Sequence, residues 1–125
     1  MSKIEKIGEF PSEVIDVLKL DIPKGTAIYI GESNIEHMKS RHPQEFEKYY
    51  SRLPRILSEP DYVGINPKDE SIEFVKQFGK HIKLAIRIAN DGEYYARSLY
   101  MITSKRVANF IKDGKLLPID KDEKT

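Results

Sequence analysis

Residues 71–103, SIEFVKQFGKHIKLAIRIANDGEYYARSLYMIT, decide the fold that we predict for this chain. From His81 to Ala89, apolar and polar side chains alternate, which is the period-two pattern of a strand with one buried face. The pattern places Lys83 and Arg87 on the opposite face of that strand. The side chains expected to lie under helices are Ile82, Leu84, Ile86 and Ile88.

Strands on either side of this segment complete a meander. Ser71–Phe78 and Tyr94–Thr103 are rich in β-branched and aromatic residues, as strands are. Gly79-Lys80 turns the chain before the central strand. Asn90-Asp91-Gly92 turns it afterwards, because these three residue types tolerate positive φ. Tyr62–Ile65 adds an edge strand, so the predicted sheet has four strands.

Helical spacing is typical of the regions around this meander. Ser104–Lys112 predicts a closing helix that ends at Gly114. In the first half of the chain, the sequence predicts helices over Pro11–Leu20, over Asn34–Arg41, from Pro43 to Leu53, and around Ile56 and Leu57. Asn34 is the expected cap of the second of these helices. A short β-branched run lies at Thr26–Ile30. The prediction is therefore an α+β fold: N-terminal helices, then a mainly antiparallel four-stranded meander, then a short C-terminal helix.

Composition limits the class of protein. The 125 residues fit one domain over 1–125, and 39% apolar residues are enough for a folded core. The chain has no cysteine, which excludes disulfides, zinc–thiolate sites and thiol nucleophiles and agrees with a reducing compartment. Neither a membrane span nor a signal peptide is apparent, so we expect a cytoplasmic protein. The charged tail at 120–125 is expected to fray.

Charge gives no overall basic field, because 21 Lys and Arg residues face 20 Asp and Glu residues. Any contact with nucleic acid must then come from local clustering. An ordinary mixed surface explains the charges equally well. The basic residues that cluster in the second half of the chain are Lys76, Lys80, Lys83, Arg87, Arg97, Lys105 and Arg106.

The histidines are the densest concentration of chemistry, since two of the three lie at His37 and His42. On a helix, Arg41 shares a face with His37, whereas His42 lies about 140° around from His37. These two imidazoles cannot chelate one metal from a regular helix, unlike the H-E-x-x-H pattern. We therefore expect no metal site. A structural histidine bonded to a backbone carbonyl is the alternative interpretation of His42.

Two strand positions are also candidates. Lys76 has the same parity as Ile72, Phe74 and Phe78, so a regular strand turns it toward the apolar side. A bulge, snorkelling of its stem to a rim, or a functional site would explain it. In the last strand, alternation puts Ser98 and Tyr100 on one face with Ala96 and Ile102. It puts Arg97 on the other face, with Tyr95, Leu99 and Met101.

Several short motifs together resemble one family. The matching segments are Ile28-Tyr29-Ile30, Ile35-x-His37-Met38-x-x-Arg41-His42-Pro43, Ile56-Leu57-x-x-Pro60-Asp61-Tyr62-Val63, Phe74-Val75-Lys76 and Arg97-Ser98-Leu99. They are similar to the phage-associated nucleases of the barnase/EndoU/colicin/RelE-like superfamily, the PBECR-type domains. The resemblance spans about 27–117, and the fold of that family agrees with helices followed by an antiparallel sheet.

The resemblance implies a phage, prophage or mobile-element endoribonuclease, toxin-like or effector-like, that needs no metal and no other cofactor. Its expected partners are RNA, such as tRNA or mRNA, and an inhibitor or antitoxin protein, but no membrane. Attack by the 2′-OH needs a base and an acid, and histidine titrates near neutrality. The implied catalytic residues are His42, His37, Arg41, Lys76 and Ser98, and the implied RNA contacts are Lys83, Arg87, Arg97 and Tyr100.

Two other functions stay open on the sequence alone. A nuclease-like module without catalysis could bind RNA or a host protein, and the near-neutral net charge agrees with it. An enzyme that uses His37 and Arg41 on a small anionic substrate has no second motif in its support.

Overall fold

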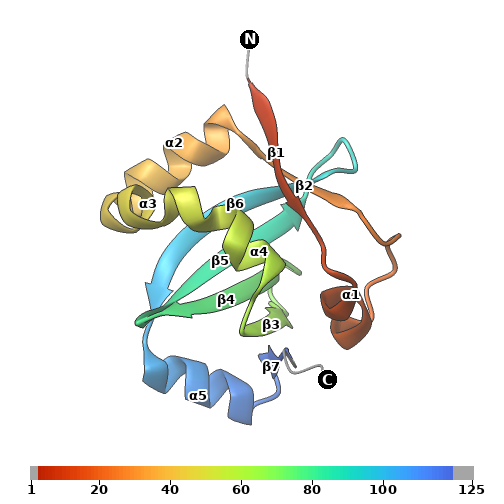
Figure 1. The fold of residues 1–125 in the computed structure, drawn as a ribbon, viewed down its shortest axis with the longest axis vertical. Coiled ribbons are helices and arrows are strands. Elements are labelled where there is room, and N and C mark those ends of the chain that lie inside the picture. The colour runs from red at the N-terminus through yellow and green to blue at the C-terminus, as the bar shows by residue number, and fades with distance from the viewer. Residues whose placement is uncertain (1–2, 120–125) are drawn as a thin grey trace.

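One mixed sheet of seven strands organises the protein, in the order β1-β2-β6-β5-β4-β3-β7 (Figure 1). The computed structural model describes residues 3–119. The strands are β1 (Ile4–Glu9), β2 (Ala27–Gly31), β3 (Tyr62–Ile65), β4 (Ile72–Phe78), β5 (Lys80–Ile88), β6 (Tyr94–Ile102) and β7 (Leu117–Pro118). The helices are α1 (Ser12–Leu18), α2 (Glu32–Arg41), α3 (Pro43–Tyr49), the 3-10 turn η1 (Tyr50–Arg52), α4 (Leu53–Ser58) and α5 (Ser104–Lys112).

The strands from β3 to β6 form an antiparallel meander, as predicted. Phe74 lies opposite Leu84, which lies opposite Leu99 on the other side. Ile82, Leu84 and Ile86 are fully buried in the core as predicted, with Lys83 and Arg87 on the opposite face. The prediction for Ile88 is wrong, since 57% of this residue is exposed. It lies at the end of β5, beside the hairpin turn.

Different helices pack against the two faces of the sheet. The large core lies on one face, where α1 to α4 supply apolar residues such as Val14, Met38 and Leu57 (Figure 1). On the other face, α5 contributes Val107 to a small cluster with Val75, Ile102 and Leu116. The rest of that face, toward β2 and β6, we call the open face.

The predicted four-stranded meander with helices in front of it is wrong as an architecture. A strand, β1, precedes every helix, and β1 and β2 extend the sheet beyond β6. The sheet is mixed because β2 pairs parallel with β6, through Ile28–Tyr94 and Tyr29–Tyr95 only. The short β7 adds to the other edge by pairing with β3.

Local helix predictions are closer to the structure. α1, α2 and α5 lie where helical spacing placed them. α2 begins at Glu32 rather than after Asn34, and Asn34 instead accepts a hydrogen bond from the backbone N–H of Gly31 at 2.8 Å. The helix predicted from Pro43 to Leu53 is divided into α3 and η1 before α4 begins. No helix within 3–119 has the length and apolar character of a membrane span. The predicted tail at 120–125 is outside the described residues.

A bulge in β6 changes which side chains reach the open face. Ala85 pairs with Ser98 but Ile86 pairs with Ala96, so Arg97 is an extra residue on β6. Ala96 and Leu99 are therefore both fully buried in the core, although they are three apart. The regular alternation predicted for Tyr94–Thr103 is wrong at this point, and Tyr95 and Ser98 lie on the same face.

Candidate functional site

The candidate site is the open face of β5 and β6, together with the helix α2 that borders it. Tyr95 lies opposite Arg87, Ser98 opposite Ala85, and Tyr100 opposite Lys83. Residues opposite one another in an antiparallel pair project to the same side of the sheet. The open face therefore carries hydroxyl and cationic groups in neighbouring positions.

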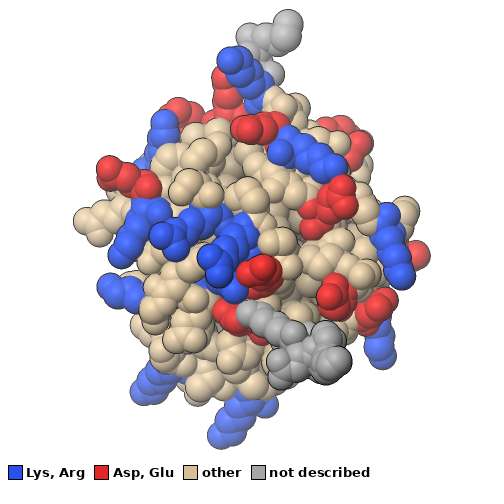
Figure 2. Space-filling view, in the orientation of Figure 1, with Lys and Arg blue, Asp and Glu red and all other residues tan. Residues whose placement is uncertain are grey.

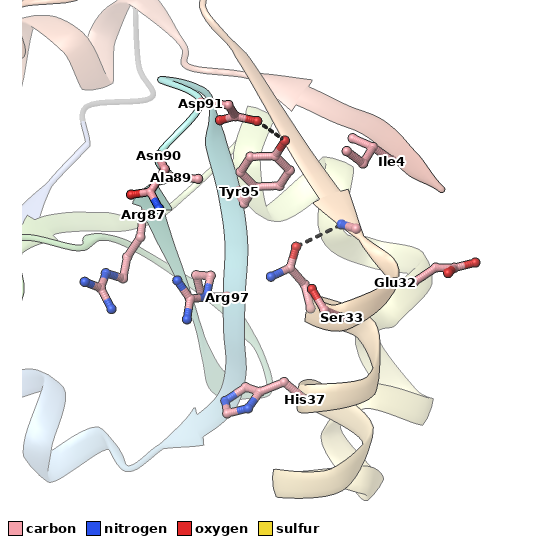
Figure 3. Close-up of a pocket in the computed structure, with 12 residues that line it drawn as sticks. Ile4, Glu32, Ser33, His37, Arg87, Ala89, Asn90, Asp91, Tyr95 and Arg97 are labelled. Carbon is pink, nitrogen blue, oxygen red and sulfur yellow. Dashed lines mark hydrogen bonds between the residues drawn. The ribbon is translucent and has the colours of Figure 1, made fainter. Parts of the chain in front are cut away.

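A hollow of about 650 Å³ opens at the β2 side of this face, and we call it the first hollow. Its lining includes His37 from α2, Arg87 from β5 and Arg97 from the β6 bulge. Figure 3 shows the two guanidinium groups and the imidazole directed to the same side of β6. Neither Arg87 nor Arg97 forms a salt bridge with another residue in 3–119. Both guanidinium groups can bind a phosphate. Hydrogen bonds from Ser71 lower the pKa of the Asp69 carboxyl, and the charge of Arg87 adds to this effect.

A tyrosine–aspartate pair fixes the rim of the first hollow. The Tyr95 hydroxyl donates a hydrogen bond of 2.7 Å to Asp91, in the β5–β6 turn (Figure 3). This bond, followed by the backbone N–H of Glu93, lowers the pKa of the Asp91 carboxyl. The same bond raises the pKa of the Tyr95 hydroxyl. At neutral pH Asp91 is thus ionised, and the Tyr95 hydroxyl already donates its hydrogen bond to Asp91.

His42 lies at the junction of α2 and α3. Its backbone N–H donates to Met38 O, and its carbonyl accepts from Phe46 N, both at 2.9 Å, so both helices hold the residue in place. The imidazole stacks on the Tyr100 ring, with 5.3 Å between ring centres and 24° between ring planes. Neither imidazole nitrogen hydrogen-bonds to another residue in the described chain. The backbone-carbonyl bond of the structural alternative is therefore not present within 3–119.

Tyr100 also contacts a buried ion pair. The Lys83 ammonium is 5.2 Å from the centre of the Tyr100 ring and 3.0 Å from a carboxylate oxygen of Glu73. Burial alone would lower the pKa of Lys83, but hydrogen bonds with Tyr100 and Glu73 and the charge of Glu73 raise it above its ordinary value. Lys83 is thus a fixed cation beneath the open face.

The remaining predicted site residues do not all lie on the open face. Ser98 is half-buried on the open face. Arg41 is exposed one turn after His37 and does not line the first hollow. Lys76 pairs with Ile82, and its ammonium is 4.0 Å from Glu59, so it lies on the helix-covered face. The structure therefore brings together His37, His42, Lys83, Arg87, Arg97, Ser98 and Tyr100 on the open side, without Lys76.

Sequence reasoning missed several residues around this face. Tyr95 and Asp91 were assigned only to a strand and a turn, although their spacing of four could have indicated contact across the hairpin end. Glu73 was not among the predicted site residues, although it is the ion-pair partner of Lys83. Arg106 was noted only as one of the clustered basic residues and Phe110 was not singled out, because α5 meets the open face only through the tertiary fold.

Basic side chains also gather on the helix-covered side. Figure 2, in the orientation of Figure 1, shows Lys and Arg over α3 and α4, bordered by acidic residues. Lys48, Arg52 and Arg55 are exposed in this part of the chain. Arg52 lies 5.1 Å from the centre of the Phe78 ring, and Arg55 pairs with Glu59. Because both sides carry cations, charge alone does not identify the functional face.

Metal ligands are not grouped in the described residues. Within 3–119, no three His, Asp or Glu side chains come close enough together to hold a metal ion. His81, the third histidine, is buried, and its Nδ1 lacks a hydrogen-bond partner in the described structure.

Residues 5–109 match the family described as phage-Barnase-EndoU-ColicinE5/D-RelE like nuclease3, or PBECR3. The chain belongs to this nuclease family. The match covers most of the chain and confirms the resemblance to phage-associated nucleases. It begins in β1, a strand that the sequence did not predict, and ends within α5. The PBECR3 chain has no significant match among curated proteins or solved structures.

Proposed function

We propose that this PBECR3 protein is a metal-independent endoribonuclease of a phage or mobile element, with a toxin-like or effector-like role. The observation that carries the proposal is that His37 of α2 and His42, at the junction of α2 and α3, meet cationic and hydroxyl side chains on the open face. Nuclease family membership supports a nucleic-acid substrate. The choice of RNA rests on the proposed chemistry, because DNA lacks the attacking 2′-OH.

The reaction assigned here is an intramolecular transesterification. One imidazole, of His42 or His37, takes the proton of the 2′-OH while its oxygen attacks the adjacent phosphorus. The other, as imidazolium, gives a proton to the leaving 5′-oxygen as the P–O5′ bond breaks. The products are a 2′,3′-cyclic phosphate and a free 5′-hydroxyl.

Cations on the same face stabilise the charge that develops on the phosphate. Arg87 and Arg97 are suited to this role because neither forms a salt bridge within 3–119 and both line the first hollow with His37. The Ser98 hydroxyl is a donor for a non-bridging oxygen. Arg41, exposed one turn after His37 on α2, is assigned a contact with the RNA backbone outside the first hollow. Lys76 is left out of the proposed site, because it lies on the other face.

The test is cleavage of a labelled RNA by His42 variants. His42→Ala should lower cleavage by about 10²–10⁴-fold, the usual contribution of a general acid or base. His42→Phe should lose as much activity while keeping the stack on Tyr100, which separates proton transfer from packing. His81→Ala is the matched control: it removes a buried imidazole outside the site, so stability should fall while cleavage per folded molecule is retained.

Three further observations belong to the same experiment. EDTA should leave cleavage intact, the products should carry a 2′,3′-cyclic phosphate, and a 2′-deoxy residue at the scissile position should block the reaction. If His42→Phe retains full activity, the histidine mechanism is wrong. If the wild-type protein binds RNA but never cuts it between pH 5 and 8, the second candidate replaces the first: a nuclease-like module that binds RNA or a host protein.

A further inference from the structure

A second hollow, of about 280 Å³, adjoins the open face on its α5 side. Lys83, Glu73 and Tyr100 line it from the sheet. Its other walls come from the β3–β4 loop and from Arg106 and Phe110 of α5. The hollow lies just below the usual range of about 300–1,000 Å³ for ligand sites, so it has room for a group no larger than about one nucleotide.

The floor of the second hollow has little net charge. Glu73 accepts from Lys83 at 3.0 Å and from the Asn66 side chain at 3.3 Å. The side chains of Lys83 and Glu73 are only 5% and 10% exposed, so the pair is largely buried although it lines the hollow. A buried pair of this kind holds its surroundings in one geometry.

The rim of the second hollow is cationic. Lys68, Arg106 and Lys115 are exposed, and none of them forms a salt bridge within 3–119. With the floor pair neutral overall, the rim leaves an excess of positive charge. An anionic ligand is therefore favoured.

Alternating rings and cations link this hollow to the proposed site. The Lys83 ammonium lies 5.5 Å from the centre of the Phe110 ring, and the Arg106 guanidinium lies 5.4 Å from the same ring. On the other side, Lys83 contacts Tyr100, on which His42 stacks. A guanidinium group beside an aromatic ring offers a nucleobase two groups on which it can stack.

We propose that the second hollow binds one nucleotide of the RNA strand next to the cleaved one. Its base stacks on the Arg106–Phe110 layer, and its phosphate is bound by Lys68 and Lys115. This inference rests on the proposed function in that RNA is the ligand, but it does not require catalysis. It adds α5 and the β3–β4 loop to the surface that binds RNA. The protein then binds RNA strands longer than the two nucleotides that flank the cleaved bond.

The test measures binding of a fluorescent hexanucleotide that is 2′-O-methylated at every position and so cannot be cleaved by 2′-OH attack. Arg106→Lys keeps the charge but loses the planar platform. It should weaken binding about fivefold or more, the lower range for loss of one base stack, while leaving the salt dependence unchanged. Lys68→Gln should instead lower the slope of log affinity against log salt by about 0.7, the value for one phosphate contact in a single strand.

Lys105→Gln is the matched control. Lys105 is also an exposed cation on α5, directly before Arg106, but it does not line the hollow. Its loss should change affinity by less than about twofold, in the range of surface substitutions. The backbone N–H of Arg106 donates to the Thr103 hydroxyl that caps α5, so side-chain changes at Arg106 leave this cap in place.

The outcomes separate this inference from the proposed function. If Arg106→Lys and Lys68→Gln bind like the wild type while His42→Ala abolishes cleavage, the nucleotide site is wrong and the enzyme stands. If they weaken binding as expected but no RNA is ever cut, the nucleotide site stands and the enzyme is wrong. If the wild-type protein does not bind the hexanucleotide even at low salt, the inference is overturned in favour of another anionic partner, such as an acidic protein.

Discussion

Removing the carboxylate from the Glu73–Lys83 pair should strongly destabilise the fold. The two side chains are 10% and 5% exposed, and their charged atoms are 3.0 Å apart. Breaking a buried pair by neutralising one partner costs about 3–5 kcal/mol, because the other charge stays buried and uncompensated. We therefore expect Glu73→Gln to lower the free energy of unfolding by at least about 3 kcal/mol at pH 7.

Urea unfolding at pH 7 measures this loss. With an m-value of about 1–3 kcal/mol per molar urea, the midpoint should fall by about 1–3 M at unchanged slope. The control is the double variant Glu73→Gln with Lys83→Met, which buries no charge at this position. It should recover most of the loss, since apolar replacement of a buried pair is often close to neutral.

The pH dependence gives a second readout with a defined sign. In the wild type the folded pKa of Lys83 is raised, so its stabilisation is complete below about pH 10.4, the unfolded value, and is lost as the pH rises through the folded value. In Glu73→Gln, burial still lowers the folded pKa of Lys83 while the charge of Glu73 no longer raises it, so the folded pKa falls below the unfolded value. That variant should become more stable as the pH rises through the folded pKa toward the unfolded value of about 10.4, a gain that the Lys83 of the wild type does not give.

These results can refute the reasoning in two ways. A loss below about 1 kcal/mol would mean that Lys83 reaches water and is not the buried partner of Glu73. A flat pH profile for Glu73→Gln would mean that the uncompensated ammonium carries no penalty.

Two further predictions concern residues of β3 and β4. Gly64→Ala places a Cβ against the backbone carbonyl of Lys115, so β3 and the segment before β7 must separate; we expect a loss of about 1–3 kcal/mol, measured as a lower thermal midpoint, and an unchanged midpoint would contradict the close approach. Lys76→Met should leave cleavage per folded molecule unchanged, because Lys76 lies on the helix-covered face; a loss of activity at full stability would return it to the catalytic residues.

The sequence was most informative where apolar periodicity was regular. Ile82, Leu84 and Ile86 alternate without interruption, so the central strand and its buried face were predictable. β1 was not predictable, because Glu5, Lys6 and Glu9 place charge on both of its faces, as is common on edge strands. Its register shift between Lys6 and Gly8 disturbs the pattern further.

The predicted architecture was wrong because the real one depends on strand pairing between distant parts of the chain. β2 has the composition of a strand, but its parallel pairing with β6 joins residues more than sixty positions apart and consists of two residue pairs. No local pattern encodes such a partner. The bulge at Arg97 was equally hidden, because Ala96 and Leu99 are both apolar in either register.

Parts of the candidate site were accessible from sequence because they are local. His37 and His42 stand close together in one helix and its end, which drew attention to them before any fold was known. The α5 side of the surface was not accessible. Phe110 and Lys83 are 27 positions apart, and only the packing of α5 against the sheet brings the ammonium to 5.5 Å from the ring.

The short pairing between β2 and β6 explains how side chains of α2 reach the open face of the sheet. After Tyr29 pairs with Tyr95, the two strands part, and α2 packs against β6 where a longer β2 would have continued. A helix along the margin of a strand can present side chains to both faces of the sheet. Met38 enters the core, whereas His37 lines the first hollow and His42 stacks on Tyr100. If β2 stayed paired along β6, its backbone would occupy the position beside β6 that α2 now holds. His37 and His42 can therefore meet Arg97 and Tyr100 only because this pairing is short.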